Sequence, residues 1–148
     1  MPDILAAGFA LIGGIAIALQ VTINAQLSRA VGHPLTAALM SVGVSAVCMI
    51  GALVALRIPV PSRGTLAGLP PWLWAGGALG AIYVTLSILA VPRLGAAVLV
   101  ALAVTGQLAT ALVLDHVGGF GLAAHGITLW RVVGAAFLVV GVILIRFF

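Results

Sequence analysis

The chain has 148 residues, of which 64% are hydrophobic and only 5% are charged. This composition excludes a soluble globular domain, and the long apolar runs predict membrane-spanning helices rather than the alternating strands of a barrel. The net charge of +4 comes from six arginines and two aspartates. Because the arginines are scattered singly along the chain, we expect no nucleic-acid binding.

The first apolar segment covers about residues 4–29 and becomes polar in its second half without a break. Gln20 and Asn24 share one helical face, which Gly13 and Ala16 continue. A helix of about 26 residues is about 39 Å long, against a hydrocarbon core of about 30 Å. Because amides that face lipid are unfavourable, we expect both to face protein or a water-filled cavity. No basic stretch precedes the segment, so we expect a retained helix rather than a cleaved signal peptide.

The second predicted span covers about residues 34–56. Gly32 can end the preceding helix, and the proline that opens this span suits a first helical turn. Ser41 and Ser45 are four residues apart and can bond their own backbone or a neighbouring helix. Cys48 is the single cysteine, which excludes an intramolecular disulfide, and we expect it to be a small buried residue.

A polar loop at residues 57–64 leads to the third predicted span, about residues 71–91, which carries Tyr83. Gly76 and Gly80 lie one helical turn apart on the same face as this tyrosine, and a pair of glycines at this spacing permits close helix approach.

A very short turn at residues 92–93 predicts a tight hairpin between the third span and the fourth, about residues 94–114. Gln107 lies in the second half of the fourth span. The glycine-rich stretch at residues 115–126 predicts an interfacial loop, and the fifth span covers about residues 128–148. The chain is thus expected to be an all-α membrane protein with five transmembrane helices in a single domain.

The arginines are divided evenly between the two sides of this predicted topology. An odd number of spans puts the two termini on opposite sides, and each side then carries three arginines. They are Arg57, Arg63 and Arg131 on the N-terminal side, and Arg29, Arg93 and Arg146 on the other. Positive charge sets orientation, so this balance predicts either insertion in both orientations or an orientation decided by a partner.

Several short motifs, in this order and spacing, resemble a known family along nearly the whole chain. They are Gln20…Asn24-Ala25-Gln26-Leu27, Gly32-His33-Pro34, Pro71-Trp72…Gly76-Gly77-Ala78-Leu79-Gly80-Ala81, Pro92-Arg93-Leu94-Gly95-Ala96-Ala97, Gly106-Gln107-Leu108 and Leu114-Asp115-His116…Gly118. The chain resembles the YdcZ-like small inner-membrane proteins of the drug/metabolite transporter (DMT) superfamily. The resemblance implies a bacterial inner-membrane, multi-pass protein equivalent to half of a ten-helix transporter.

Full-length relatives in this superfamily contain two such halves in opposite orientation. This inverted repeat allows the substrate site to open to each side of the membrane in turn, which is alternating access. The resemblance therefore implies an antiparallel dimer of identical chains, or of two paralogous five-helix chains. The small four-helix multidrug exporters of the superfamily carry an acid in their first helix, whereas no Asp or Glu lies inside any span here. This absence favours a neutral, zwitterionic or weakly polar substrate, or coupling by a group other than a carboxylate.

The polar residues inside the predicted spans are the candidate substrate-binding residues. They are Gln20, Asn24, Tyr83 and Gln107, with Thr22, Ser87, Thr105 and Thr110 as lesser members. They would line a shared cavity and hydrogen-bond a polar substrate, or they would simply bridge helices. No paired carboxylates or nucleophile motif is present, and the histidines fall in loops, so we expect no enzyme, metal or cofactor.

Asp115 is expected at the C-terminal end of the fourth span, where the helix dipole disfavours an anion. We expect compensation by Arg131 or Arg57, which makes an ion pair the first interpretation and a proton or substrate role the second. Arg93 is expected to reach the headgroups and orient the hairpin, or to contact an anion at the mouth of a cavity.

These observations predict a dimeric transporter of a small polar or amphipathic metabolite or drug. Two alternatives remain open at this point. The chain could be a non-transporting membrane subunit that stabilises another complex, with its polar residues bridging helices. It could also be a flippase for lipid carriers, since small members of the superfamily handle lipid-linked sugars.

Overall fold

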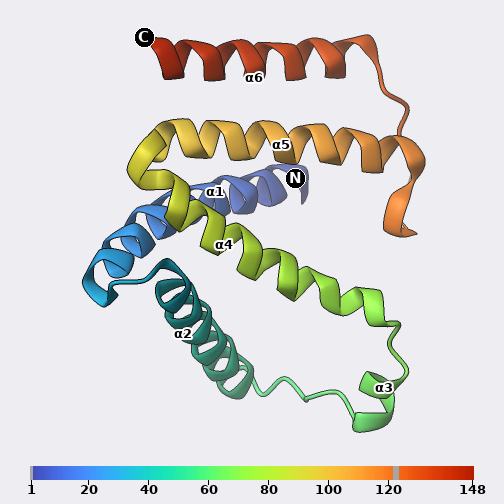
Figure 1. The fold of residues 1–148 in the computed structure, drawn as a ribbon. Coiled ribbons are helices and arrows are strands. Elements are labelled where there is room, and N and C mark those ends of the chain that lie inside the picture. Colours follow the sequence, from blue (N-terminus) through green and yellow to red (C-terminus); the bar gives the residue numbers. More distant parts are fainter. Residues whose placement is uncertain (1, 122–123) are drawn as a thin grey trace. The chain divides into compact units, whose positions relative to one another are not determined.

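The computed structural model describes residues 2–121 and 124–148, and all regular structure in these ranges is helical (Figure 1). Among these residues, five helices are long and apolar enough to cross a membrane. They are α1 (Pro2–Val31), α2 (Pro34–Ala55), α4 (Ala75–Leu94), α5 (Ala96–Val117) and α6 (Leu129–Phe147). The predicted fold class, an all-α membrane protein with five transmembrane helices, is confirmed. The chain forms two compact units, one ending at Arg93 and one comprising Leu94–Phe148.

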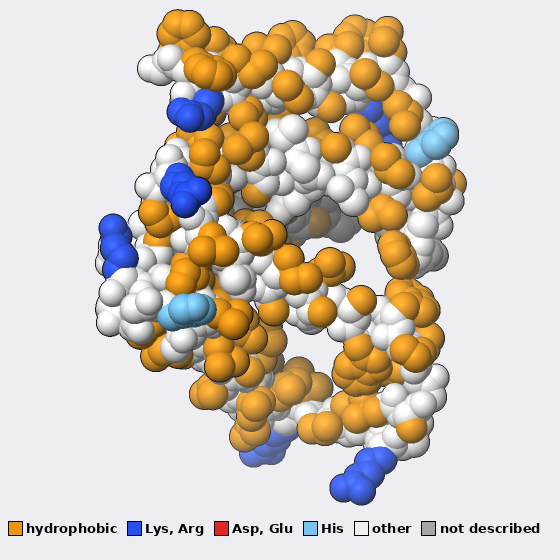
Figure 2. Space-filling view, in the orientation of Figure 1, with side chains coloured by type: hydrophobic (Ala, Val, Ile, Leu, Met, Phe, Trp, Pro, Cys, Tyr) orange, Lys and Arg blue, Asp and Glu red, His pale blue; other side chains and the backbone are white. Residues whose placement is uncertain are grey.

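Large apolar side chains are exposed along every long helix. Examples are Phe9 on α1, Val47 on α2, Leu79 on α4, Val113 on α5 and Phe137 on α6. Figure 2 shows that hydrophobic side chains cover much of the visible surface, whereas Lys and Arg form only a few separate spots. Such surfaces are unfavourable in water and favourable in lipid, so the helices are suited to a membrane.

The turn between α1 and α2 is set by three consecutive residues. Gly32 adopts φ +82°, and its N–H donates to the Ser28 carbonyl at 2.9 Å. The Nδ1 atom of His33 accepts from the Leu35 N–H at 3.2 Å, and Pro34 occupies the first turn of α2. This arrangement satisfies helix-end groups in both directions and brings the end of α1 beside the start of α2, as the glycine and proline predict.

The polar segment after α2 is not entirely a loop. A short helix, α3 (Arg63–Ala67), begins where the Ser62 hydroxyl accepts from the Thr65 N–H at 3.2 Å. A 3-10 turn, η1 (Pro71–Trp74), then leads directly into α4. The sequence does not predict α3, because five residues are too few for a periodic apolar pattern, although a serine at its start is a suitable cap.

The predicted turn at residues 92–93 is wrong, because α4 continues through Pro92 to Leu94. The chain breaks instead at Gly95, which adopts φ +79°. A proline in the last helical turn removes one N–H donor, whereas the backbone conformation at Gly95 is one that L side chains rarely adopt. The helix therefore ends at the glycine. Similarly, α5 runs three residues beyond the predicted boundary and ends at Gly118, which adopts φ +63°.

The best-buried cluster of the first unit joins α1, α2 and α4. Ala37 and Ala38 of α2 and Ile88 of α4 are its buried members, and Leu27, Val31 and Val84 pack against them. Ala37 is 0% exposed. Alanine at this position lets the backbone of α2 approach its neighbours closely, which is how membrane helices pack in the absence of a hydrophobic driving force between them.

Enlarging this contact is expected to destabilise the first unit. Ala37→Leu inserts three extra carbons where no space remains, and overpacking of this kind costs about 1–3 kcal/mol. Ala46→Leu is the matched control, because Ala46 lies on the same helix and is exposed. Thermal unfolding of the purified protein in detergent should show a lower midpoint for the first variant alone. Equal midpoints would mean that the cluster does not support the packing of α2.

The expectation that Cys48 is buried is wrong. Its side chain is exposed, about three helical turns beyond Ala37 on α2. At Gly76 and Gly80, a Cβ built on the backbone meets no atom of another element of the first unit within 4 Å, so the close approach that this spacing permits is not used within that unit.

Candidate functional site

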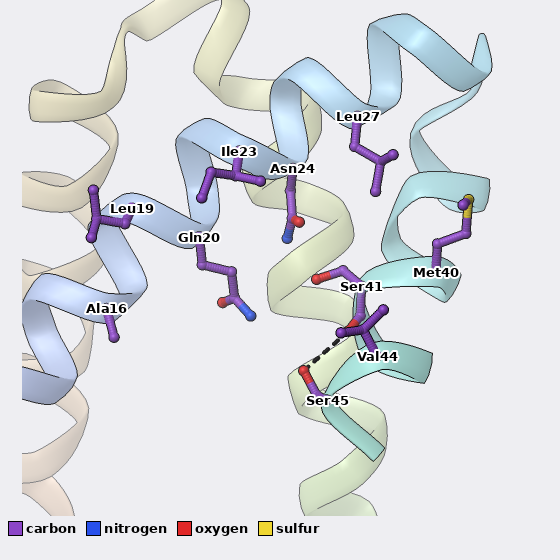
Figure 3. A pocket seen from close by; sticks show the side chains of 10 residues that line it. All are labelled: Ala16, Leu19, Gln20, Ile23, Asn24, Leu27, Met40, Ser41, Val44 and Ser45. Atoms are coloured by element: carbon purple, nitrogen blue, oxygen red, sulfur yellow. Dashed lines mark hydrogen bonds between the residues drawn. The ribbon is translucent and has the colours of Figure 1, made fainter. Parts of the chain in front are cut away.

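A cavity of about 580 Å³ lies between α1 and α2. Its polar members are Gln20 and Asn24 of α1 and Ser41 and Ser45 of α2, and Figure 3 shows the side chains around it. The apolar members are Ala16, Leu19, Ile23, Leu27, Met40 and Val44. The two amides are four residues apart, so the helical period places them on the face of α1 that looks toward α2.

The side chain of Asn24 is buried, and its amide has no hydrogen-bond partner among the described residues. The side chain is only 5% exposed, and it makes no hydrogen bond to any residue in the described part of the chain. Within that part, no fully buried polar side-chain atom lacks a partner, so the Asn24 amide keeps an accessible side. Figure 3 shows it directed toward the space between the helices. A buried amide in this state is open to a hydrogen bond from a ligand or water.

Gln20 lies one turn before Asn24, is half-buried and likewise makes no hydrogen bond to a described residue. On α2, the Ser45 hydroxyl donates to the Ser41 carbonyl at 3.0 Å, the bond drawn in Figure 3. The Ser41 hydroxyl makes no such bond within the described residues. The cavity thus offers two amides and one hydroxyl whose donors and acceptors are uncommitted.

The hydroxyls of the lesser polar residues hydrogen-bond to the backbone of their own helices. Each donates its hydroxyl to the carbonyl four residues earlier: Thr22 to Ala18, Ser87 to Tyr83, Thr105 to Ala101 and Thr110 to Gly106. This bond satisfies the hydroxyl inside an apolar environment without a neighbouring helix. These residues therefore have less capacity for a substrate than the cavity amides have.

Of the four candidate substrate-binding residues, the structure brings two into one cavity. Tyr83 lies on α4 in the first unit and is half-buried, but it does not line the cavity between α1 and α2. Gln107 lies on α5 in the second unit, where its side chain is exposed. The two serines of α2 complete the cavity; their spacing is visible in the sequence, but their position opposite α1 is not.

A second polar feature joins α5 and α6, which lie side by side in the second unit. Arg131 Nη1 lies 3.3 Å from Asp115 Oδ2, and the pair lines a cavity of about 310 Å³ between the two helices. The His125 N–H also donates to the Asp115 carbonyl at 2.7 Å, which holds the connecting segment against the end of α5. Asp115 is thus compensated by Arg131, whereas Arg93 lies exposed in the last turn of α4.

Both members of this ion pair lie at the helix end where the dipole opposes their charge. Asp115 is in the last turns of α5, and Arg131 is in the first turn of α6. The double variant Asp115→Arg/Arg131→Asp keeps the pair and reverses both dipole interactions. We expect it to unfold at a temperature equal to or above that of the wild type.

The single variants Asp115→Asn and Arg131→Gln should each lower the unfolding temperature slightly. The side chains are 36% and 37% exposed, and pairs of this exposure contribute only about 0–1 kcal/mol. Thermal unfolding of all four proteins checks the prediction. A double variant less stable than either single variant would contradict the dipole argument.

Across the residues that the structure describes, no three His, Cys, Asp or Glu side chains come together in a way that could hold a metal ion. The cavity between α1 and α2 likewise contains no acid, base or nucleophile paired for catalysis. Its lining offers hydrogen bonding and apolar contact, so such a site can bind a small molecule.

A family model described as "Putative inner membrane exporter, YdcZ" matches residues 5–144. A search of curated proteins and a search of solved structures each found no match to this chain. The family model covers nearly the whole sequence, including all five long helices, and it describes transport proteins of the inner membrane rather than enzymes. The chain therefore belongs to the YdcZ family of inner-membrane exporters and is a multi-pass protein of that membrane.

Proposed function

We propose that the chain exports a small polar or amphipathic molecule as one half of a dimeric transporter. Two five-helix chains in opposite orientation would form the unit, equivalent to a ten-helix transporter of the DMT superfamily, and would expose the site to each side of the membrane in turn. Three features support this proposal: membership of an exporter family, five spans, and arginines divided equally between the two sides.

The observation that carries the proposal is the uncommitted amide of Asn24 beside the cavity. The polar atoms of this amide stay accessible from the cavity and make no hydrogen bond to a described residue, so a substrate can pair with both the N–H₂ group and the carbonyl. Gln20 lies on the same face and completes the α1 part of the proposed site. We propose that Tyr83 and Gln107 contribute from the other helices of the dimeric assembly, where an oppositely oriented chain supplies further surfaces.

Export by the chain can be tested even though the substrate is unidentified. Cells that overproduce the wild-type chain are compared with cells carrying an empty vector, and the compounds in the medium are measured by mass spectrometry. We expect at least one small neutral or zwitterionic compound to accumulate outside the overproducing cells. Purified chain in proteoliposomes should then transport that compound.

Gln107→Ala is expected to lower this export, because the substitution removes the single amide on α5. Ala109→Val on the same helix is a suitable control, since Ala109 is exposed and carries no polar group. Export is measured at equal amounts of protein in the membrane. Unchanged export kinetics in Gln107→Ala would remove this residue from the proposed site, and the absence of any exported compound would contradict the proposed function itself.

A further inference from the structure

We infer that the cavity between α1 and α2 selects an uncharged amphipathic ligand whose polar end both donates and accepts hydrogen bonds, as a primary amide does. This inference rests on the proposed transport function and adds the chemical class of the substrate. The cavity wall combines a few uncharged polar side chains with a larger apolar surface.

The polar part of the wall requires both hydrogen-bonding functions from its ligand. Each amide, at Gln20 and Asn24, has an N–H₂ donor and a carbonyl acceptor, and the Ser41 hydroxyl can act in either sense. None of the three is bonded to a described residue. A ligand with acceptors only would leave the amide carbonyls unpaired, and a ligand with donors only would leave the N–H groups unpaired. Both deficits reduce affinity, because the bound ligand would cover polar groups of the site without pairing them.

Charged ligands are disfavoured by the same wall. All ten residues that line the cavity are uncharged. The Asp115–Arg131 pair lines a separate cavity between α5 and α6. An ammonium or carboxylate entering between α1 and α2 would lose hydration and meet no opposite charge, which is far more costly than burying an amide. The cavity is therefore suited to a neutral head group.

The apolar part of the wall accommodates the body of the ligand. Leu19, Ile23, Leu27, Met40 and Val44 supply this surface, and Ala16 continues it along α1. The volume of about 580 Å³ falls within the range of about 300–1,000 Å³ that is typical of small-molecule sites. Since the two amides occupy one face of α1, the ligand should have a single polar end and an apolar remainder.

Four probes with one phenylpropyl body and different head groups test this inference. They are 4-phenylbutanamide, methyl 4-phenylbutanoate, 4-phenylbutylamine and 4-phenylbutanoate, which carry a donor–acceptor, an acceptor, a cation and an anion. Their dissociation constants are measured by thermal-shift titration of the full chain in lipid nanodiscs. The amide is expected to bind at least about tenfold more tightly than each of the others. Equal or tighter binding of a charged probe, or no binding of the amide at millimolar concentration, overturns the inference.

Substitutions test whether 4-phenylbutanamide binds in the cavity between α1 and α2. Gln20→Leu and Asn24→Leu should each weaken amide binding about tenfold. Gln26→Leu should leave it unchanged, because Gln26 is exposed and lies outside the cavity wall. Asn24→Asp should gain affinity for 4-phenylbutylamine above the pKa of the new carboxyl. This gain cannot arise from misfolding. Unchanged amide binding in both leucine variants, with no gain in Asn24→Asp, overturns the inference.

Failure of the inference and failure of the proposed function give different results. A chain that exports a compound but binds the amide no better than the amine contradicts the ligand class and leaves the transport function intact. A chain that binds the amide selectively but exports nothing contradicts transport and leaves the ligand class intact. Export is scored on the compounds found in the medium, which requires none of the four probes.

Discussion

Asn24→Leu is expected to reduce export about five- to 150-fold, while the thermal stability of the protein stays unchanged or rises. The loss of a ligand hydrogen bond to a buried amide costs about 1–3 kcal/mol, and about 1.4 kcal/mol corresponds to a factor of ten. Leucine is similar in shape to asparagine and needs no partner. In the unliganded chain it therefore removes an uncommitted amide without opening a cavity.

This divergence between activity and stability separates a binding residue from a structural one. An asparagine that bridges helices would lose stability on substitution, and its export would fall only as far as the amount of folded protein falls. Export of the compound released by the wild-type chain is measured together with the unfolding midpoint of the purified variant. Gln26→Leu serves as the control, because it also replaces an amide of α1 with leucine but lies outside the cavity. A lower midpoint with proportionate loss of export would assign Asn24 a structural role.

The helices are largely predictable, because apolar runs of about 20 residues identify spans from composition alone. The turn at Gly32 and Pro34 is predictable because both residues act locally. The sequence is less informative where two local signals compete, as at Pro92 and Gly95. Both residues disfavour helix, and only the backbone geometry shows that the glycine, with φ +79°, supplies the break.

The candidate site is predictable only within one helix. A period of 3.6 residues places Gln20 and Asn24 on one face, whichever neighbour that face meets. That the neighbour is α2, with Ser41 and Ser45 opposite the amides, depends on the packing of Ala37 and Ala38 and is not encoded in any local pattern. For the same reason the sequence cannot decide whether a polar residue of another span shares the cavity.

The chain is expected to insert into the membrane in both orientations. We expect about half of the molecules to present their C-terminus outside, because both sides carry three arginines. The measurement replaces Cys48, which is exposed, with alanine and adds one cysteine after Phe148. Intact cells are then labelled with a membrane-impermeant thiol reagent before and after permeabilisation. Labelling of about half of the chains before permeabilisation would support an antiparallel homodimer.

Single added charges should shift this balance in opposite directions. Val60→Arg adds a positive charge to the side of the N-terminus and should raise the fraction labelled outside, whereas Phe148→Arg should lower it. Both positions are exposed, so neither change disturbs packing within the chain. If the wild type is instead labelled entirely or not at all, the orientation is fixed by something other than arginine balance. The proposed inverted unit then requires a second, oppositely oriented chain, and purification of the protein from its native membrane should yield a paralogous five-helix partner in equal amount.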